Sequence, residues 1–305
     1  MLRLYGAERL APEWLACTAT VGVFDGLHLG HQALLRRTVE AAREREHPAV
    51  LVTFDRHPLE VLMPDRAPAR LTALADSLEP AAELGIAAAL ILPFDGRMAQ
   101  MPAEDFCHGL LGGRLRAAGF VIGEDFRFGA GRRGDAEMLR SLGPVEIFGP
   151  VSGDSGERFS SSAIRQALAE GDLPAANRML GRPWSLRAAV VPGQKLGRTL
   201  GFPTLNLARM EPTILPPDGV YAGRCETPVG RFRAAISLGS RPTVAGAGRS
   251  LEAFLLDYPG DSIYGSAVRL EWLHRLRPEA RFDSLDALVE QMHRDVAEVR
   301  HLVPE

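Results

Sequence analysis

TVGVFDGLHLGHQALL, residues 20–35, joins an apolar run to a turn rich in glycine and histidine and then to an amphipathic stretch. This order predicts a buried strand that passes through a short loop into a helix. Further short apolar runs alternate with helical stretches such as 30–46 and 103–119 up to about residue 149, which is typical of a parallel sheet covered by helices. The predicted strands are residues 20–24, 49–54, 88–94, 120–123 and 145–150.

The sequence pattern changes near residues 181–186. Beyond that point glycine and proline separate strand-like segments, which predicts a compact antiparallel barrel. Residues 284–302 form a predicted helix that packs on this barrel through one apolar stripe. The stripe consists of Leu285, Leu288, Val289, Met292, Val296 and Val299. We therefore expect an α/β chain with a parallel-sheet domain over residues 1–182 and a barrel domain, closed by the long helix, over residues 183–305.

Composition narrows the class of protein. The 305 residues are 46% hydrophobic with a formal net charge of −3, which allows buried cores but gives no broad basic excess for binding nucleic acid. No apolar run approaches the roughly 20 residues that span a bilayer, and the N-terminus lacks the pattern of a signal peptide. Cys17, Cys107 and Cys225 lie far apart without metal-ligand spacing, which indicates buried thiols in a reducing compartment. We expect a cytoplasmic protein with no nucleic-acid partner and no membrane segment.

His28 and His31 lie where the first strand gives way to a helix. The start of a helix presents unpaired N–H groups that favour an anion, and each imidazole can donate a hydrogen bond to an oxygen that gains charge. Gly26 and Gly30 let the backbone approach such an anion closely. No carboxylate or thiolate stands at the spacing of a zinc site, so metal ligation is the weaker interpretation. The alternative is that both histidines only complete a turn.

Two further stretches have the composition of phosphate-binding loops. RFSSSAIRQAL, residues 158–168, places three serines before a helical run, with Arg165 in its first turn. Hydroxyl groups, free N–H groups and a guanidinium together fit the far phosphates of a nucleotide, although one such serine is more commonly only a helix cap. GEDFRFGAGRRGD, residues 123–135, mixes glycine with Arg127, Arg132 and Arg133, and the alternative there is a solvated loop.

PGQKLGRTLGFPTLNL, residues 192–207, carries glycines at 193, 197 and 201 and fails the P-loop pattern GxxxxGK[ST]. Lys195 is the only lysine in the chain, which suggests that a compact ammonium group suits this loop. Thr204 and Asn206 alternate along an extended segment, so both side chains would face one side and could bind Mg²⁺, unless they only form a turn. Glu252, on a predicted strand, is a candidate general base or else a solvated carboxylate.

The first half resembles a known family. GVFDGLHLGH, TFDRHPLEVL, GEDFRFGAGRRGD and RFSSSAIRQAL, in that order, are similar to the nucleotidyltransferase module of the bacterial bifunctional riboflavin kinase/FMN adenylyltransferase family, also called FAD synthetase. The second half resembles the riboflavin kinase module of that family through GRTLGFPTLNL, PPDGVYAG, SLGSRPTV, LEAFLLDYPGDSIYG and LRPEARFDSLDALVEQMHRD. Together the two modules cover nearly the whole chain.

For the first half, the resemblance implies a Rossmann-like nucleotidyltransferase domain that adenylylates FMN with ATP, giving FAD and pyrophosphate. His28 and His31 would stabilise charge on the transferred group, and residues 161–165 would hold the departing pyrophosphate. The loop with His57 and Pro58 would lie near the flavin. The residues implied for binding the nucleotide are Gly22, Phe24, Asp25, Gly26, Gly30, Asp125, Arg127, Ser161, Ser162 and Arg165.

For the barrel, the resemblance implies ATP-dependent phosphorylation of riboflavin to FMN. Glu252 would be the base, and Thr204 and Asn206 would hold Mg²⁺ and the nucleotide. The other residues implied for the nucleotide are Gly193, Lys195, Gly197, Arg198 and Gly201, in a loop that closes over ATP. Ser237 stands where the family more usually has asparagine, which puts a local hydrogen bond in question.

Other functions stay open at this point. The HxGH pattern is shared by many nucleotidyltransferases and by class I aminoacyl-tRNA synthetases, so an acceptor other than FMN, such as a pantetheine phosphate or nicotinate mononucleotide, is one alternative. A flavin-binding regulator without turnover is a second, and a chain with one working module is a third. Riboflavin, FMN, ATP and FAD are the expected small-molecule partners, and self-association into a homo-oligomer is left open.

Overall fold

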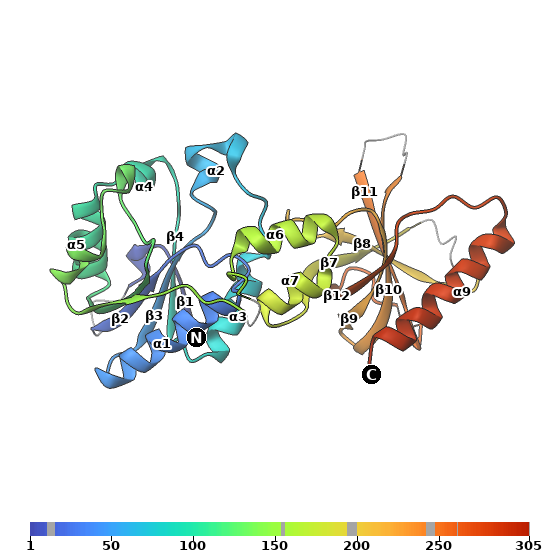
Figure 1. Cartoon of the computed structure of the whole chain (residues 1–305), viewed down its shortest axis with the longest axis horizontal. Coiled ribbons are helices and arrows are strands. Elements are labelled where there is room, and N and C mark those ends of the chain that lie inside the picture. Colours follow the sequence, from blue (N-terminus) through green and yellow to red (C-terminus); the bar gives the residue numbers. More distant parts are fainter. Residues whose placement is uncertain (11–15, 154–155, 194–199, 242–247, 261, 305) are drawn as a thin grey trace. The chain divides into compact units, whose positions relative to one another are not determined.

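The computed structural model describes residues 1–10, 16–153, 156–193, 200–241, 248–260 and 262–304. The chain divides into two compact units (Figure 1). The first consists of Met1–Arg70 and Leu74–Ser161, and the second of Leu71–Ala73 and Ser162–Glu305. Among the helices in these ranges, none is long and apolar enough to cross a membrane.

The first unit is built on a six-stranded parallel sheet with the strand order β1-β4-β3-β2-β5-β6, which confirms the predicted α/β class. The strands are β1 (Leu2–Tyr5), β2 (Cys17–Val21), β3 (Ala49–Phe54), β4 (Ala88–Leu92), β5 (Ala117–Gly123) and β6 (Val145–Phe148). The chain moves from β2 outward through β3 and β4 on one side and continues with β5 and β6 on the other. The order therefore reverses between β2 and β5, where open sheets of this kind bind ligands.

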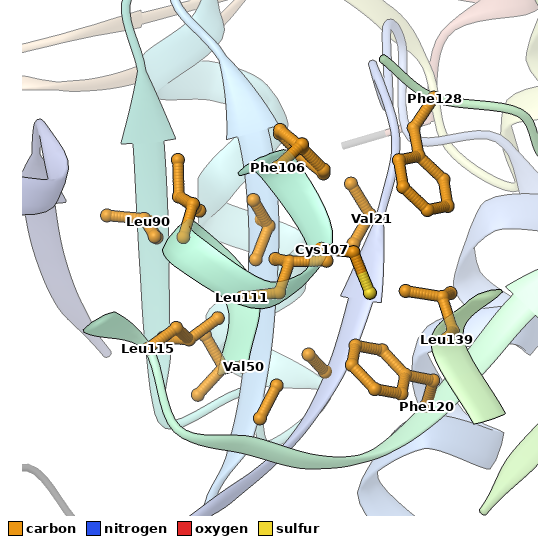
Figure 2. Close-up of a cluster of buried hydrophobic side chains, with 14 of the residues drawn as sticks. Val21, Val50, Leu90, Phe106, Cys107, Leu111, Leu115, Phe120, Phe128 and Leu139 are labelled. Carbon is orange, nitrogen blue, oxygen red and sulfur yellow. The ribbon is translucent and has the colours of Figure 1, made fainter. Parts of the chain in front are cut away.

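Helices cover both faces of this sheet. The helices of this unit are α1 (Leu29–Glu44), α2 (Leu59–Leu62), α3 (Leu74–Glu83), α4 (Gly96–Gln100), the π-helix η3 (Asp105–Arg114), α5 (Ala136–Arg140) and the short 3₁₀ turns η1 (Ala7–Arg9), η2 (Pro64–Arg66) and η4 (Ala130–Arg132). Figure 2 shows Cys107 and Leu111 of η3 facing Val21, Val50 and Leu90 of the sheet. A second apolar cluster packs α1 and α3 on the opposite face. Strands that are buried on both faces in this way have continuous apolar sequences.

Three details of the first unit differ from the sequence prediction. The edge strand β1 was not expected. The strand expected at residues 20–24 is instead β2, Cys17–Val21, and Phe24 lies beyond its end with a left-handed backbone, φ +52°. The helical stretch expected over residues 103–119 is shorter than predicted and is mostly a π-helix, since η3 ends at Arg114 and β5 already begins at Ala117. Between the two, Arg116 turns the chain with φ +55°.

The second unit holds a closed antiparallel barrel with the strand order β10-β11-β8-β7-β12-β9, as predicted. Its strands are β7 (Trp184–Val191), β8 (Thr204–Arg209), β9 (Gly219–Thr227), β10 (Gly230–Arg241), β11 (Gly248–Leu255) and β12 (Ala267–Arg277). Buried and half-buried residues alternate along β7, and Trp184, Tyr221 and Trp272 fill the interior. This alternation is what a filled barrel requires.

Two helices, α6 (Ser161–Glu170) and α7 (Leu173–Leu180), precede the barrel. The amide nitrogen of Asn177 in α7 donates to the carbonyl oxygen of Trp272 at 2.9 Å, and its amide oxygen accepts from the backbone N–H of Trp184 at 2.7 Å. Because one side chain bonds to both β12 and β7, α7 is part of the same folded unit as the barrel.

The last helix, α9 (Leu285–Leu302), packs on the barrel as expected, but not through the whole predicted stripe. Val299 is fully buried against Ala222 and Leu256, whereas Leu285 is 61% exposed. In the middle of the helix the buried side chain is Asp295, whose carboxylate accepts from both Nε and Nη2 of Arg277 on β12, at 3.0 and 2.8 Å. A polar pair therefore holds the centre of α9, where the sequence predicted only apolar contact.

Candidate active sites

The loop between β2 and α1 has a fixed and strained backbone. Phe24 and Leu27 have positive φ angles of 52° and 41°, which non-glycine residues rarely adopt, and both side chains are buried. Gly26 lies between them with φ +78°. The Ser161 hydroxyl donates to the carbonyl oxygen of Asp25 at 2.9 Å, which fixes the loop from the start of α6. Strain of this kind is concentrated at functional sites, because only such sites need a backbone of one particular shape.

His28 and His31 lie together at the N-terminus of α1. His28 is the N-cap, and its Nδ1 accepts from the backbone N–H of His31 at 3.3 Å. The two rings stack with their centroids 3.7 Å apart, and the edge of His31 meets Phe24 at 5.1 Å. An imidazole that accepts at Nδ1 carries its hydrogen on Nε2, so His28 can donate a hydrogen bond from Nε2. The predicted pair of donors is thus held in one place by the cap.

His31 contains a buried polar atom that lacks a partner in the described structure. Its Nδ1 atom is buried without any hydrogen bond there. Burial, with the nearby His28 as a smaller cause, holds the pKa of His31 well below its usual value of 6.5. A buried nitrogen without a partner is unfavourable, so this position suits a ligand that supplies a hydrogen-bonding oxygen. A phosphate at the helix N-terminus would do so.

The low pKa of His31 predicts how stability depends on pH. Below about pH 6.5 the unfolded chain binds a proton at this residue that the folded chain excludes, so the free energy of unfolding falls as the pH drops from 7. For one group the slope reaches about 1.4 kcal/mol per pH unit. Thermal unfolding without nucleotide, measured from pH 7.5 to 5.5, should show a smaller loss of stability in His31→Gln than in the parent protein.

The exposed His108 provides the control. His108→Gln should keep the parental pH dependence. An equal dependence in the parent protein and in His31→Gln would contradict the assignment.

Asp125 and Arg127 follow β5, the strand next to β2 at the point where the strand order reverses. The Asp125 carboxylate pairs with Nη2 of Arg158 at 3.1 Å, and its carbonyl oxygen accepts from Arg132 at 3.4 Å. Arg127 lines a hollow of about 260 Å³ at the end of β5. Arg158 was not singled out by the sequence analysis, although it opens the serine-rich run. Its ion pair with Asp125 connects the loop after β5 to the segment that leads to Ser161.

The loop with His57 and Pro58 follows β3. Nδ1 of His57 accepts from the backbone N–H of Leu59 at 3.1 Å, and its own backbone N–H donates to Glu60 at 2.8 Å. The end of α2 next to it is apolar and exposed, with Leu62 54% accessible to solvent. Such a surface suits one face of a planar, apolar ligand.

In the barrel, the structure brings Thr204, Asn206 and Glu252 together. The strand register places Glu252 of β11 directly opposite Asn206 of β8 on one side and Ser237 of β10 on the other. The Thr204 hydroxyl donates to Oε2 of Glu252 at 2.9 Å. The adjacent residues along these strands, among them Leu251, point into the buried interior, so this polar row lies on the outer face of the barrel.

The glycine-rich loop is described only at its two ends, since Lys195, Gly197 and Arg198 lie outside the described residues. At the first end, a Cβ atom on Gly193 would lie 2.1 Å from the side-chain nitrogen of Asn206, so only glycine allows the backbone to pass there. At the other end, Gly201 has φ +82°. Both ends therefore belong to the same site as the polar row.

A cleft of about 580 Å³ opens beside Thr204. Gly201 and Pro203 line it, as do Asp257 and Ser262 from beyond β11. Its aromatic lining residues are Phe254, Tyr258 and Tyr264. A cleft with aromatic walls beside a polar row fits a ligand with a planar base and a charged tail.

The oxygen donors of the barrel fit magnesium better than a transition metal. Among the residues that the structure describes, no group of three or more histidine, cysteine, aspartate or glutamate side chains is arranged to hold a metal ion. The hydroxyl of Thr204, the amide of Asn206 and the carboxylate of Glu252 are hard oxygen donors on neighbouring strands. Mg²⁺ takes one or two protein oxygens and completes its shell with waters and phosphate oxygens, so this small set suits it.

The two sites together define a nucleotide-dependent transferase with two active centres, and comparison with known proteins identifies its family. The family model for FAD synthetase matches residues 11–163 and the model for riboflavin kinase matches residues 180–303. The chain belongs to the bifunctional riboflavin kinase/FMN adenylyltransferase family. It phosphorylates riboflavin to FMN and adenylylates FMN to FAD, using ATP. These findings confirm the predicted activities and set aside the other acceptors and the inactive regulator.

The similarity to individual proteins extends over nearly the whole chain. The bifunctional riboflavin kinase/FMN adenylyltransferase of Escherichia coli K12 is 42% identical over 287 residues, covering 92% of this chain and 90% of the relative. That of Bacillus subtilis strain 168 is 32% identical over 289 residues, with 91% and 90% covered. A crystal structure from Streptococcus pneumoniae, described as a macrolide-efflux protein, matches with a TM-score of 0.89 at 32% identity and covers 98% of this chain and 99% of its own.

Proposed function

We propose that Glu252 is the base of the kinase reaction. The 5′-hydroxyl oxygen of riboflavin attacks the γ-phosphorus of ATP, the bond from that phosphorus to the bridging oxygen breaks, ADP leaves, and the hydroxyl proton passes to the Glu252 carboxylate. The observation that carries this proposal is the 2.9 Å hydrogen bond from Thr204 to Glu252, which orients the carboxylate beside the cleft. Transfer of a phosphoryl group depends mostly on positioning and neutralising charge, so one oriented carboxylate suffices.

In the same site, Thr204 and Asn206 would hold Mg²⁺ together with the phosphates of ATP. When bound, the ion supplies neutralisation of the charge that develops on the transferred phosphoryl group. Gly193 keeps the backbone of the glycine-rich loop against Asn206, and we propose that the loop, with Lys195 and Arg198, closes over the phosphates. The aromatic cleft then takes the adenine of ATP, since Gly201 and Pro203 at the end of the loop line it.

For adenylyl transfer, we propose that a phosphate oxygen of FMN attacks the α-phosphorus of ATP and pyrophosphate leaves. His28 donates from Nε2, and His31 donates at its buried position, to oxygens that gain charge in this step. Gly22, Gly26 and Gly30 leave room for the phosphates to approach the loop, and Asp125 and Arg127 contact the nucleotide from the neighbouring strand. The loop with His57 and the exposed edge of α2 receive the flavin.

Ser161 has a structural role that supports the same proposal, because its hydroxyl fixes the carbonyl of Asp25. Ser162 and Arg165 follow it on α6 in the second unit, and their contact with pyrophosphate stays a prediction. We also propose that the two activities divide near residues 182 and 183, close to the start of the riboflavin kinase match at residue 180, although the compact units divide after Ser161. The buried free cysteines support a cytoplasmic location, and self-association stays a prediction.

Removal of metal should stop the kinase reaction. With excess EDTA, FMN formation from riboflavin and ATP is expected to fall to background and to return when Mg²⁺ exceeds the chelator, because Thr204 and Asn206 alone cannot neutralise the phosphates. Thr204→Val should raise the Mg²⁺ concentration needed for half-maximal activity. Thr213→Val is the matched control, since the Thr213 hydroxyl lacks a partner in the described structure, and it should keep the parental requirement. Full activity in EDTA would contradict the proposal.

A further inference from the structure

One wall of the barrel cleft is a strained turn at Asp257. β11 ends at Leu255, and Asp257 follows with a left-handed backbone, φ +59°. The residues here that line the cleft are Asp257, Tyr258, Gly260, Ser262, Ile263 and Tyr264. Aspartate adopts this conformation more readily than most non-glycine residues, so the contacts of its side chain decide how firmly the turn is held.

The side chain of Asp257 is fixed by two arginines. Both oxygens accept from Arg300 in the last turn of α9, Oδ1 from Nη2 at 2.7 Å and Oδ2 from Nη1 at 3.0 Å. Oδ2 also accepts from Nη2 of Arg233 on β10 at 3.1 Å. The Arg300 guanidinium, with Arg233 as a smaller cause, holds the pKa of Asp257 below its usual range. Exposed ion pairs are usually weak, but a bidentate arginine within a network is the arrangement that does contribute.

Apolar contacts hold the same junction. Leu256 is 2% exposed and packs with Val299 and Val303, both fully buried, at the C-terminal end of α9. Leu256 also donates its backbone N–H to the carbonyl oxygen of Arg233 at 2.9 Å. The end of α9 is therefore attached to the residues that begin this wall by both packing and charge.

The helix also contacts a second segment beside the cleft. Phe202 lies between Gly201 and Pro203, which line the cleft, and its ring meets His293 of α9 at a centroid distance of 5.0 Å. Phe202 in turn meets Phe254, another lining residue, at 5.3 Å. One helix thus contacts two segments of the chain that border the cleft.

We propose that α9 sets the position of the two segments that border the cleft, at residues 201–203 and at Asp257, and that Arg300 and Asp257 are positioning residues for the ATP of the kinase reaction. This inference rests on the proposed function, in which the cleft receives the adenine of ATP. Neither residue takes part in the transfer of the phosphoryl group. Their loss should weaken ATP binding and leave the chemical step nearly unchanged.

The test replaces the charged group of Arg300. Arg300→Met keeps the aliphatic stem that covers the barrel and removes the guanidinium. In the kinase assay, KM for ATP is expected to rise about fivefold, the effect of losing one well-formed ion pair. The kcat and the KM for riboflavin should stay within about twofold, and FAD formation from supplied FMN should not change. Arg294→Met is the matched control, because Arg294 lies on the same helix and pairs only locally with Glu290 in the described structure.

Two more variants keep the result decisive. Asp257→Asn removes the charge but suits the left-handed backbone, which asparagine tolerates, and it should raise KM for ATP as Arg300→Met does. Combining both changes should add little to either alone, because they break the same contact. Parental KM values for ATP in both single variants, or equal effects in Arg294→Met, would overturn the inference.

Failure of the proposed function would look different. Ser262 lines the cleft, so Ser262→Trp would fill it. If that variant raises KM for ATP while Arg300→Met does not, the cleft binds ATP and the role of α9 is wrong. If Ser262→Trp leaves KM for ATP unchanged, ATP lies elsewhere and the proposed binding of adenine in the cleft fails.

Discussion

Glu252→Gln is expected to abolish FMN formation from riboflavin while FAD formation from supplied FMN continues at the parental rate. The amide cannot take the proton of the ribityl hydroxyl, and loss of a general base commonly lowers the rate by about 10²- to 10⁴-fold. The fold should survive, because the Thr204 hydroxyl can donate to the amide oxygen of glutamine as it does to Oε2 of Glu252. Chromatographic separation of riboflavin, FMN and FAD after incubation with ATP and Mg²⁺ measures both reactions at once.

The control for this experiment is Glu226→Gln, which changes an exposed carboxylate on β9 of the same barrel. It should form FMN as the parent protein does. If Glu252→Gln also formed FMN at the parental rate, Glu252 would not be the base.

The second large effect is expected in the other unit. The double variant His28→Ala plus His31→Ala should lower FAD formation from FMN by about 10²-fold or more, because it removes two donors aimed at the transferred group. FMN formation from riboflavin should be unchanged. The same chromatographic assay, started from FMN, measures the loss.

This variant also removes the N-cap of α1, which by itself costs about 1 kcal/mol of stability. His28→Asn plus His31→Gln separates the two effects, because asparagine keeps an acceptor at the cap and neither replacement has an imidazole. Thermal unfolding should show that this pair is nearly as stable as the parent, yet FAD formation should still be slow. FAD formation at the parental rate in both double variants would show that the histidines are not needed.

Most of the fold could be predicted from local sequence patterns. The apolar runs of β3 and β4 are continuous because both faces of the sheet are covered, so their strand character is plain from sequence. The edge strand Leu2–Tyr5 is short and mostly exposed, and its pairing with β4 depends on residues far away in the chain. The π-helix Asp105–Arg114 has the same apolar composition as an α-helix, so composition gave no sign of its different hydrogen bonding.

The candidate sites could be predicted where one motif carries several functional groups. His28 and His31 stand three residues apart, and Thr204 and Asn206 alternate on one strand, so local spacing already places each pair on one side. Pairs between distant segments were missed. Arg158 with Asp125, and Arg300 with Asp257, meet only after the chain has folded, and the sequence marks each arginine as an ordinary surface cation.

The polar row of Ser237, Glu252 and Asn206 projects outward from a barrel whose interior is filled by side chains such as Trp184 and Trp272. The barrel therefore supports the active site on its outer face and does not enclose the substrates. Substrates and products can exchange without separation of the strands. Substitutions in the barrel interior are expected to change thermal stability more than the rate of catalysis.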